Sequence, residues 1–290
     1  MEGIASTVMI DGALVPAERA VVSVFDRGFL YGDSVFESLR TYRGKPFDLS
    51  LHLARLERSA ARVFIPLPIS VAILEREVLQ AIDAHSSVER YVRMTLTRGV
   101  GRSLGLDPEL AETPLRVIQV MDLTLPPPEL YERGIHAISY RIERASDTAG
   151  VADAKIGNYL LAVLAMRAAR AAGAQDALLM SSNGDLLEGT TSNVFAVFGG
   201  KLLTPPENSA ILPGITRAHV LELARVTGVP VELRAMPKAE IAGADEVFIC
   251  SSIRELVPVV NLDGRAVGPG VPGPVTRELH RLYRAARLDA

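Results

Sequence analysis

Three consecutive prolines, Pro126 to Pro128, interrupt the chain near its middle. Proline lacks a backbone N–H and fixes its own φ angle, so a run of three continues neither a helix interior nor a central strand. The surrounding stretch, LTLPPPELYERG, therefore predicts an interdomain linker over 121–132, with a smaller domain over 1–120 and a larger one over 133–290. A chain of 290 residues is long enough for two modest domains with buried cores.

The two halves differ in their sequence patterns. The first reads as strands joined by turns, with helices expected over about 50–64 and after a capping Ser70. Its segment 34–42, SVFESLRTY, alternates apolar and polar residues. The second half alternates strands with helices, including an alanine- and leucine-rich helix over about 158–172. The sequence thus predicts a mixed α/β (α+β) protein in two lobes.

Composition excludes several classes of function. Hydrophobic residues make up 48% and charged residues 22%, which is typical of a globular protein. The net charge of −3 gives no basic excess for nucleic acid or an anionic membrane. The longest apolar stretch, which stops at Arg167, is too short to cross a bilayer, and the amino terminus lacks a signal-peptide pattern. With Cys250 as the single cysteine, we expect a cytoplasmic protein that engages neither a membrane nor nucleic acid.

Several common catalytic chemistries are also disfavoured. The five histidines are scattered without the spacing of metal ligands, so no metal site is expected. The chain has no GxSxG nucleophile elbow, no P-loop and no GxGxxG after a strand.

Lysine is scarce, which singles out one position. The 31 basic residues include only four lysines: Lys45, Lys155, Lys201 and Lys238. Lys155 stands between the small residues Ala154 and Gly157, where a loop is expected to meet a helix. A lysine amine forms a Schiff base with an aldehyde cofactor when its pKa is lowered. The same position also fits a solvent-exposed lysine at a helix start.

Other segments offer groups that suit a phosphate-bearing cofactor. Glu188 ends an apolar strand and could pair with a pyridine nitrogen, or simply be an edge-strand glutamate. Thr216, in LPGITR, lies where a helix is expected to begin, and the first N–H groups of that helix suit a phosphate. The alternative is an ordinary helix start with no ligand. Arg55 carries a fork of donors for phosphate, although surface arginines are common nearby.

The motifs in their order resemble the class IV aminotransferases, the pyridoxal-phosphate (PLP) fold-type IV family. The resemblance covers nearly the whole chain and runs through DRGFLYGDSVFESLR, HLARL, AKIGNYL, EGTTSNVF, LLTPP, LPGITR, DEVFICSSIRELVPV and GPVT. That family includes branched-chain aminotransferases, D-amino-acid aminotransferases and aminodeoxychorismate lyases. The resemblance implies a smaller N-terminal α/β sandwich, a larger C-terminal α/β barrel-like domain, PLP as the cofactor and a homodimer with shared active sites.

The resemblance also implies roles for individual residues. Lys155 would be the Schiff-base lysine and proton shuttle, Glu188 would pair with the pyridine nitrogen, and Tyr159 would hydrogen-bond the phenolic oxygen. Together with residues that pack on the ring or hold the phosphate, the expected cofactor-binding set is Arg55, Lys155, Tyr159, Glu188, Leu212, Ile215, Thr216, Ser251 and Ser252. The expected substrate-binding set is Tyr31, Phe36, Tyr91, Arg93, Ile253 and Arg254. In this family Tyr31 commonly reaches the active site of the neighbouring subunit.

Some motifs point to different branches of the family. The turn SSIR is bulkier than in typical branched-chain enzymes, and Arg254 adds a positive charge there. GTTSN is similar to the D-amino-acid and lyase branches, whereas SVFES and the Tyr91–Arg93 pair are similar to the branched-chain branch. GVGRSLGL, with Arg102, is similar to a D-amino-acid carboxylate loop, but Leu104 replaces its histidine.

The expected activity is therefore amino-group transfer between an aliphatic, branched-chain L-amino acid and a 2-keto acid such as 2-oxoglutarate. The alternatives are a D-amino-acid or (R)-amine transaminase, and a lyase that makes 4-aminobenzoate. A relative that only binds a ligand is disfavoured, because a binding module has no need of the proton shuttle Lys155.

Overall fold

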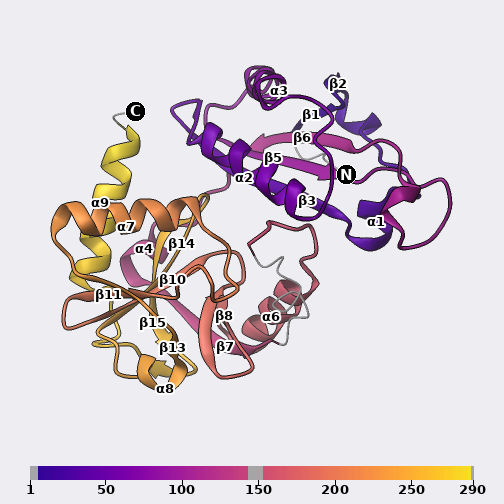
Figure 1. Cartoon of the computed structure of the whole chain (residues 1–290). Coiled ribbons are helices and arrows are strands. Elements are labelled where there is room, and N and C mark those ends of the chain that lie inside the picture. The colour runs from indigo at the N-terminus through magenta and orange to yellow at the C-terminus, as the bar shows by residue number, and fades with distance from the viewer. Residues whose placement is uncertain (1–5, 143–152, 289–290) are drawn as a thin grey trace. The chain divides into compact units, whose positions relative to one another are not determined.

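The computed structural model describes residues 6–142 and 153–288 (Figure 1). The chain divides into two compact units, and each is described by itself. Unit 1 comprises Met1–Thr124 and Ala154–Asn158, and unit 2 comprises Leu125–Asp153 and Tyr159–Ala290. In the described part of the chain, no helix combines the length and the apolar character needed to cross a membrane.

The short segment 154–158 departs from the expected domain division, which assigned it to the larger domain. Its backbone pairs with unit 1 instead: Ile156 bridges Val35, and the Gly157 N–H donates to the Ser34 carbonyl at 2.8 Å. The proline run gave no sign of this, because the segment returns to unit 1 after the expected linker. The division between Thr124 and Leu125 falls inside the expected linker.

Unit 1 is a sheet with helices packed on it (Figure 1). The strand order is β2-β1-β6-β5-β3-β4. The strands are β1 (Ser6–Ile10), β2 (Ala13–Val15), β3 (Ser34–Tyr42), β4 (Lys45–Pro46), β5 (Arg90–Thr97) and β6 (Leu115–Asp122). The helices are α1 (Arg27–Tyr31), α2 (Leu49–Arg62) and α3 (Val71–Asp83), with 3₁₀ turns at Ala17–Arg19 and Pro108–Leu110. Apolar side chains of α2 and α3 form one core with those of β1, β3, β5 and β6.

Strand β3 is buried almost throughout, although its alternating sequence is typical of a half-exposed strand. Its polar residues are buried because other groups satisfy them. The Thr41 hydroxyl donates to the Val88 carbonyl at 2.9 Å. The Glu37 carboxylate accepts hydrogen bonds from Arg55. Polar residues in a strand therefore mark buried hydrogen-bonding positions here rather than a solvated face.

Unit 2 is built on a sheet that closes on itself. The strand order is β12-β11-β10-β14-β15-β7-β8-β9-β13, and a further pairing of Asn193 with Glu188 joins β10 to β9. The strands from β10 to β9 therefore form a closed ring, a barrel. Its strands are β7 (Ile135–Arg141), β8 (Asp176–Met180), β9 (Asp185–Gly189), β10 (Asn193–Phe198), β14 (Glu246–Ser251) and β15 (Glu255–Leu262). Outside it lie β11 (Lys201–Thr204), β12 (Val231–Leu233), β13 (Met236–Pro237) and β16 (Arg265–Ala266).

Successive side chains of a barrel strand point to opposite faces of the sheet, so alternate residues join two different core clusters. On β10, Val194 and Ala196 join a cluster with residues from the other barrel strands, whereas Phe195 and Val197 pack against helices. These helices are α7 (Ile215–Thr227) and α9 (Pro274–Leu288); α6 (Leu160–Ala171) covers β7 and β8 in the same way. Two short helices, α4 (Glu129–Arg133) and α8 (Lys238–Ile241), complete the unit (Figure 1). The expected α/β sandwich and barrel-like domain are confirmed.

Candidate functional site

Lys155 is held to unit 1 at both sides of its peptide backbone. Its N–H donates to the Ser59 hydroxyl at 3.1 Å, and its carbonyl accepts from the Phe36 N–H at 3.0 Å. Ser59 lies on α2, one helical turn after Arg55. A strand and a helix thus fix the backbone from which the Lys155 amine extends.

The Phe36 ring brings two predicted site residues together. Lys155 Nζ lies 4.5 Å from the ring centroid, and Arg93 Cζ lies 3.8 Å from it. Both distances are within the range of cation–π attraction. On β5, Tyr91 and Arg93 are half-buried and alternate with fully buried Val92, as the period-two spacing predicts.

Arg55 and Glu37 form a buried ion pair in the same unit. Arg55 Nε donates to Glu37 Oε1 at 2.6 Å, and Nη2 donates to Oε2 at 2.8 Å. His52 Nδ1 lies 2.7 Å from Glu37 Oε2. Burial would raise the pKa of Glu37, but the hydrogen bonds from Arg55 and His52 outweigh it and lower the pKa to about 2. The predicted phosphate ligand Arg55 therefore has a built-in counter-charge.

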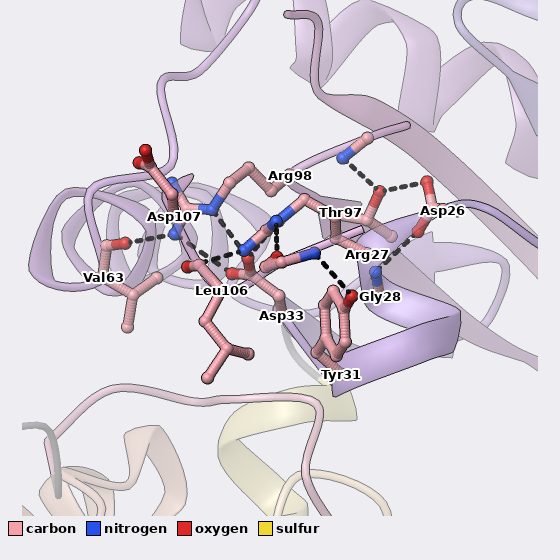
Figure 2. A network of polar contacts seen from close by, with 12 residues as sticks. Asp26, Arg27, Gly28, Tyr31, Asp33, Val63, Thr97, Arg98, Leu106 and Asp107 are labelled. Atoms are coloured by element: carbon pink, nitrogen blue, oxygen red, sulfur yellow. Dashed lines mark hydrogen bonds and ion pairs between the residues drawn. The ribbon is translucent and has the colours of Figure 1, made fainter. Parts of the chain in front are cut away.

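Tyr31 ends α1 beside the loop over residues 99–107 (Figure 2). Its hydroxyl accepts a hydrogen bond from the Gly105 N–H at 3.2 Å. Arg27, on the same helix, donates to the carbonyls of Gly105 and Leu106 at 2.8 and 3.1 Å. This loop carries Arg102, the residue that resembles part of a carboxylate-binding loop. Tyr31 and the loop thus form one hydrogen-bonded assembly.

Asp33 organises that assembly through two arginines (Figure 2). Its carboxylate accepts from Arg27 Nε at 3.0 Å and from Arg98 Nε and Nη2 at 2.7 and 3.0 Å. Arg98 also donates to the carbonyl of Val63, after α2. The motif DRGFLYGD gave no sign of these roles, because Arg98 is 65 residues from Asp33 in the sequence.

In unit 2, the remaining predicted residues gather around one end of the barrel and the start of α7. Strand β9 ends and β10 begins there, and β14 turns into β15 at the same end. The Leu212 N–H donates to Glu188 Oε2 at 3.3 Å, and the Leu212 carbonyl accepts from Asn193 Nδ2 at 2.9 Å. A Cβ atom on Gly214 would lie only 1.9 Å from Asn193 Oδ1, so this turn requires glycine.

Helix α7 begins at Ile215 without a side-chain cap and without an acidic residue in its first turn. Such a helix start attracts an anion, because its first N–H groups have no intrahelical acceptor. The Thr216 hydroxyl lies 3.2 Å from that of Tyr283, on α9. The buried Arg217 follows in the same turn and donates to the Pro205 carbonyl at 2.8 Å. Burial lowers the pKa of the Arg217 guanidinium.

The turn between β14 and β15 contains Ser252, Ile253 and Arg254. The Arg254 N–H donates to the Ser251 hydroxyl at 3.2 Å. In the described part of the chain, the Ile253 N–H has no hydrogen-bond acceptor. The Arg254 guanidinium does not stand alone: Nη1 donates to Asp176 Oδ2 at 2.7 Å. Asp176 was missed from the sequence, where a single acid at the start of an apolar strand was the only signal.

The predicted residues thus fall into two groups, one on each unit. Unit 1 carries Tyr31, Phe36, Arg55, Tyr91, Arg93 and Lys155, and unit 2 carries Tyr159, Glu188, Leu212, Ile215, Thr216, Ser251, Ser252, Ile253 and Arg254. Tyr159 directly precedes α6. Over residues 6–142 and 153–288, no group of three or more His, Cys, Asp or Glu side chains is placed to hold a metal ion.

Comparison with known families decides what this residue set belongs to. The family model described as amino-transferase class IV matches residues 34–262, which is more than half of the chain. The chain belongs to the class IV amino-transferase family. The match includes Lys155, Glu188 and Arg254 as well as most strands of both units.

Several relatives of this class IV amino-transferase cover almost the whole chain. A Methanocaldococcus jannaschii protein, named provisionally as a branched-chain-amino-acid aminotransferase, is 37% identical over 97% of this chain and 96% of its own. The D-alanine aminotransferase of Bacillus licheniformis is 34% identical over 97% of each chain. The crystal structure of the Escherichia coli branched-chain amino acid aminotransferase has a TM-score of 0.91 at 31% identity, over 97% of this chain and 94% of its own.

Proposed function

We propose that this class IV amino-transferase binds PLP through Lys155 and moves amino groups between an aliphatic, branched-chain L-amino acid and a 2-keto acid such as 2-oxoglutarate. The observation that carries the proposal is the placement of the Lys155 amine on the Phe36 ring by a backbone fastened at its N–H and its carbonyl. A similar branched-chain amino acid aminotransferase, with a TM-score of 0.91, was solved with pyridoxamine 5'-phosphate.

The chain offers groups that fit each part of PLP. Lys155 supplies an amine for the aldehyde, and Glu188 supplies a carboxylate for the ring nitrogen. The uncapped start of α7 supplies N–H groups for a phosphate. The preceding turn lies so close to the Asn193 side chain that only a glycine fits at position 214. We assign the phosphate to Arg55, Ile215, Thr216 and Ser252, the ring face to Leu212 and the phenolic oxygen to Tyr159. Ser251 completes the proposed cofactor-binding set.

The proposed mechanism assigns three tasks to the protein. PLP, when bound, supplies an aldehyde that condenses with amines and a ring that accepts electron density. Lys155 would hold the cofactor through its amine and, once an amino donor replaces it there, would carry a proton from the donor's α-carbon. Glu188 would keep the ring nitrogen protonated. The Ile253 N–H and its neighbours orient the substrate carboxylate, and Tyr31, Phe36, Tyr91, Arg93 and Arg254 shape the substrate side.

The substrate is tested by single-turnover spectra of the PLP-loaded protein. L-Leucine, D-alanine and (R)-phenylethylamine are each added, and the change in cofactor absorbance is recorded. The proposal predicts conversion by L-leucine, with return of the starting spectrum when 2-oxoglutarate is added. A protein that takes up no PLP, or that L-leucine does not convert, contradicts it.

A D-amino-acid transaminase is the second candidate, favoured by the 34% identity to the D-alanine aminotransferase over nearly the full chain. Conversion by D-alanine but not by L-leucine would select this candidate. Conversion by (R)-phenylethylamine alone would select an amine transaminase. If no amine converts the cofactor and aminodeoxychorismate yields pyruvate, the enzyme is a lyase.

We also propose a homodimer and a cytoplasmic location. Unit 1 exposes a set of apolar side chains on and around α1 and the 99–107 loop: Val24, Phe25, Phe29, Leu30, Leu104 and Leu106. Exposed apolar side chains in such number favour an interface. Tyr31, which lies among them, would contribute to the partner's site. The single cysteine, Cys250, fits a reducing compartment. Cell fractionation tests the location, and a membrane-bound or secreted product contradicts it.

A further inference from the structure

Asp176 links two turns at the end of the barrel. Its carboxylate is fully buried at the start of β8. Oδ1 accepts hydrogen bonds from the Thr190 hydroxyl at 2.7 Å and from the Ala177 N–H at 2.8 Å, and Oδ2 accepts from Arg254 Nη1 at 2.7 Å. A buried carboxylate is tolerated only when it is paired and hydrogen-bonded. Asp176 therefore ties the turn after β9 to the turn after β14.

Arg254 is held at its backbone and at its side chain. Its N–H donates to the Ser251 hydroxyl, and its carbonyl accepts from the Tyr131 hydroxyl at 3.1 Å. Besides the Asp176 bond, Nη2 donates to the Thr191 hydroxyl at 3.1 Å. The positive charge of Arg254 is thus matched by the buried negative charge of Asp176. The Arg254 guanidinium is therefore already paired with a carboxylate of the protein before any substrate binds.

The turn that contains Arg254 needs such support. The next residue, Glu255, has a φ of +57°. A non-glycine residue in that region costs about 1–3 kcal/mol, so surrounding contacts must maintain it. Hydrogen-bond donors on this turn are effective only if they are already in place when the substrate arrives. The Asp176–Arg254 ion pair is the contact that anchors the turn to the opposite side of the barrel ring.

We infer that the Asp176–Arg254 ion pair is a positioning device for carboxylate recognition. It fixes the Ser252–Arg254 turn so that the Ile253 N–H meets the carboxylate, and Arg254 does not itself supply the binding charge. The inference rests on the proposed function, which provides an amino-acid or keto-acid carboxylate. Asp176 and Arg254 are positioning residues, because they act through the turn.

Asp176→Asn distinguishes the two possible roles of Arg254, with Arg254→Gln measured beside it. Asp176→Asn keeps the shape of the side chain and releases the arginine charge. If Arg254 bound the carboxylate directly, Asp176→Asn would leave KM unchanged or lower it, while Arg254→Gln would raise it. If the ion pair positions the turn, both variants raise KM for amino and keto acids on the order of 10- to 100-fold. The double variant is then no worse than either single one.

Arg254→Lys provides a second, milder variant in case Asp176→Asn does not fold. Lysine keeps the charge but cannot reach Asp176 and Thr191 together, since it has no planar fork of donors. Positioning predicts that KM rises in Arg254→Lys as in Arg254→Gln, with a smaller change in kcat. Direct binding by charge predicts that Arg254→Lys retains most of the wild-type affinity. Arg281→Gln breaks an exposed ion pair with Glu278 and serves as the control.

The experiment combines steady-state kinetics of the PLP-loaded chain with hydrogen–deuterium exchange of the cofactor-free chain. We expect faster exchange at residues 250–256 in Asp176→Asn, Arg254→Gln and Arg254→Lys, together with the shared rise in KM. The inference is overturned if exchange there stays at the wild-type rate, or if Asp176→Asn or Arg254→Lys retains the wild-type KM. Failure of the proposed function has a different signature: the wild type takes up no PLP and transfers no amino group, while exchange still reports on the turn.

Discussion

The Arg55 guanidinium donates two hydrogen bonds to the Glu37 carboxylate, from Nε at 2.6 Å and from Nη2 at 2.8 Å. Both side chains are buried, and they connect α2 to β3. The residue proposed to hold the cofactor phosphate is therefore oriented by a carboxylate on β3 that precedes it by 18 residues in the chain. This pair makes a prediction about pH that involves no ligand.

Glu37 should make the stability of the protein depend on acid. Its pKa falls from 4.5 in the unfolded chain to about 2 in the folded state, so its contribution is full above pH 4.5 and is lost as the pH falls towards 2. A shift of that size is worth about 3 kcal/mol at most. Glu37→Gln lacks this contribution and removes the carboxylate that accepts the two hydrogen bonds from Arg55. Urea unfolding at a series of pH values should show the wild type and variant converging in acid; parallel curves would contradict the account.

Gly214 should tolerate no side chain. A methyl group would meet Asn193 Oδ1 at 1.9 Å, so Gly214→Ala must move the turn that leads into α7. We expect a loss of about 1–3 kcal/mol of stability and a weaker affinity for PLP. Gly243→Ala is the matched control, since its nearest atom would lie at an ordinary 3.5 Å. Thermal unfolding and PLP titration measure both effects, and equal behaviour of the two variants would contradict the close approach.

Phe29 should contribute to the proposed dimer. Its side chain is 70% exposed on α1, among the other exposed apolar residues of unit 1. Phe29→Asp places a charge in that surface and should shift the protein towards the monomer, as measured by light scattering after size exclusion. Phe64→Asp is the control, because Phe64 is 83% exposed just after α2. A monomeric wild type, or a Phe29→Asp dimer as stable as the wild type, would count against this interface.

Cys250 should be unreactive in the folded protein. Burial raises the pKa of its thiol to about 12, so almost no thiolate exists near neutral pH. A disulfide reagent at pH 8 should label no thiol in the native chain and one after unfolding in urea. Prompt labelling of the native protein would show that the strand carrying Cys250 opens readily.

Local pattern predicted most elements because their periodicity and caps are unambiguous. The helix expected over 50–64 is observed at Leu49–Arg62, and Ser70 caps the following helix with a bond from the Ile73 N–H. The stretch VELRAM reads locally as one strand, but it forms β12 and the first residue of β13, which pair with different neighbours. Strand pairing of that kind depends on distant parts of the chain, which a local pattern does not contain.

The proposed site shows the same limit. Lys155 and Glu188 stood out from residue type and surrounding motif. Their supporting partners did not, because Glu37 looked like the polar half of an alternating strand and Asp176 like a strand-edge acid. The scattered histidines gave no sign that His52 faces the Glu37 carboxylate. Arg254 was expected to add a positive charge at its turn, and no pattern in the sequence indicated that folding places this charge against Asp176. Pairings across many residues in sequence become visible only in three dimensions.

Chemical trapping of the cofactor tests the central claim most directly. The protein is loaded with PLP, reduced with borohydride, digested and mapped by mass spectrometry. Only four lysines can carry the label, so the map has few possible outcomes. The account predicts one phosphopyridoxyl group per chain, on Lys155, and none in Lys155→Arg, which keeps the charge on the Phe36 ring. A label on Lys45, Lys201 or Lys238, or no label in the wild type, would contradict it.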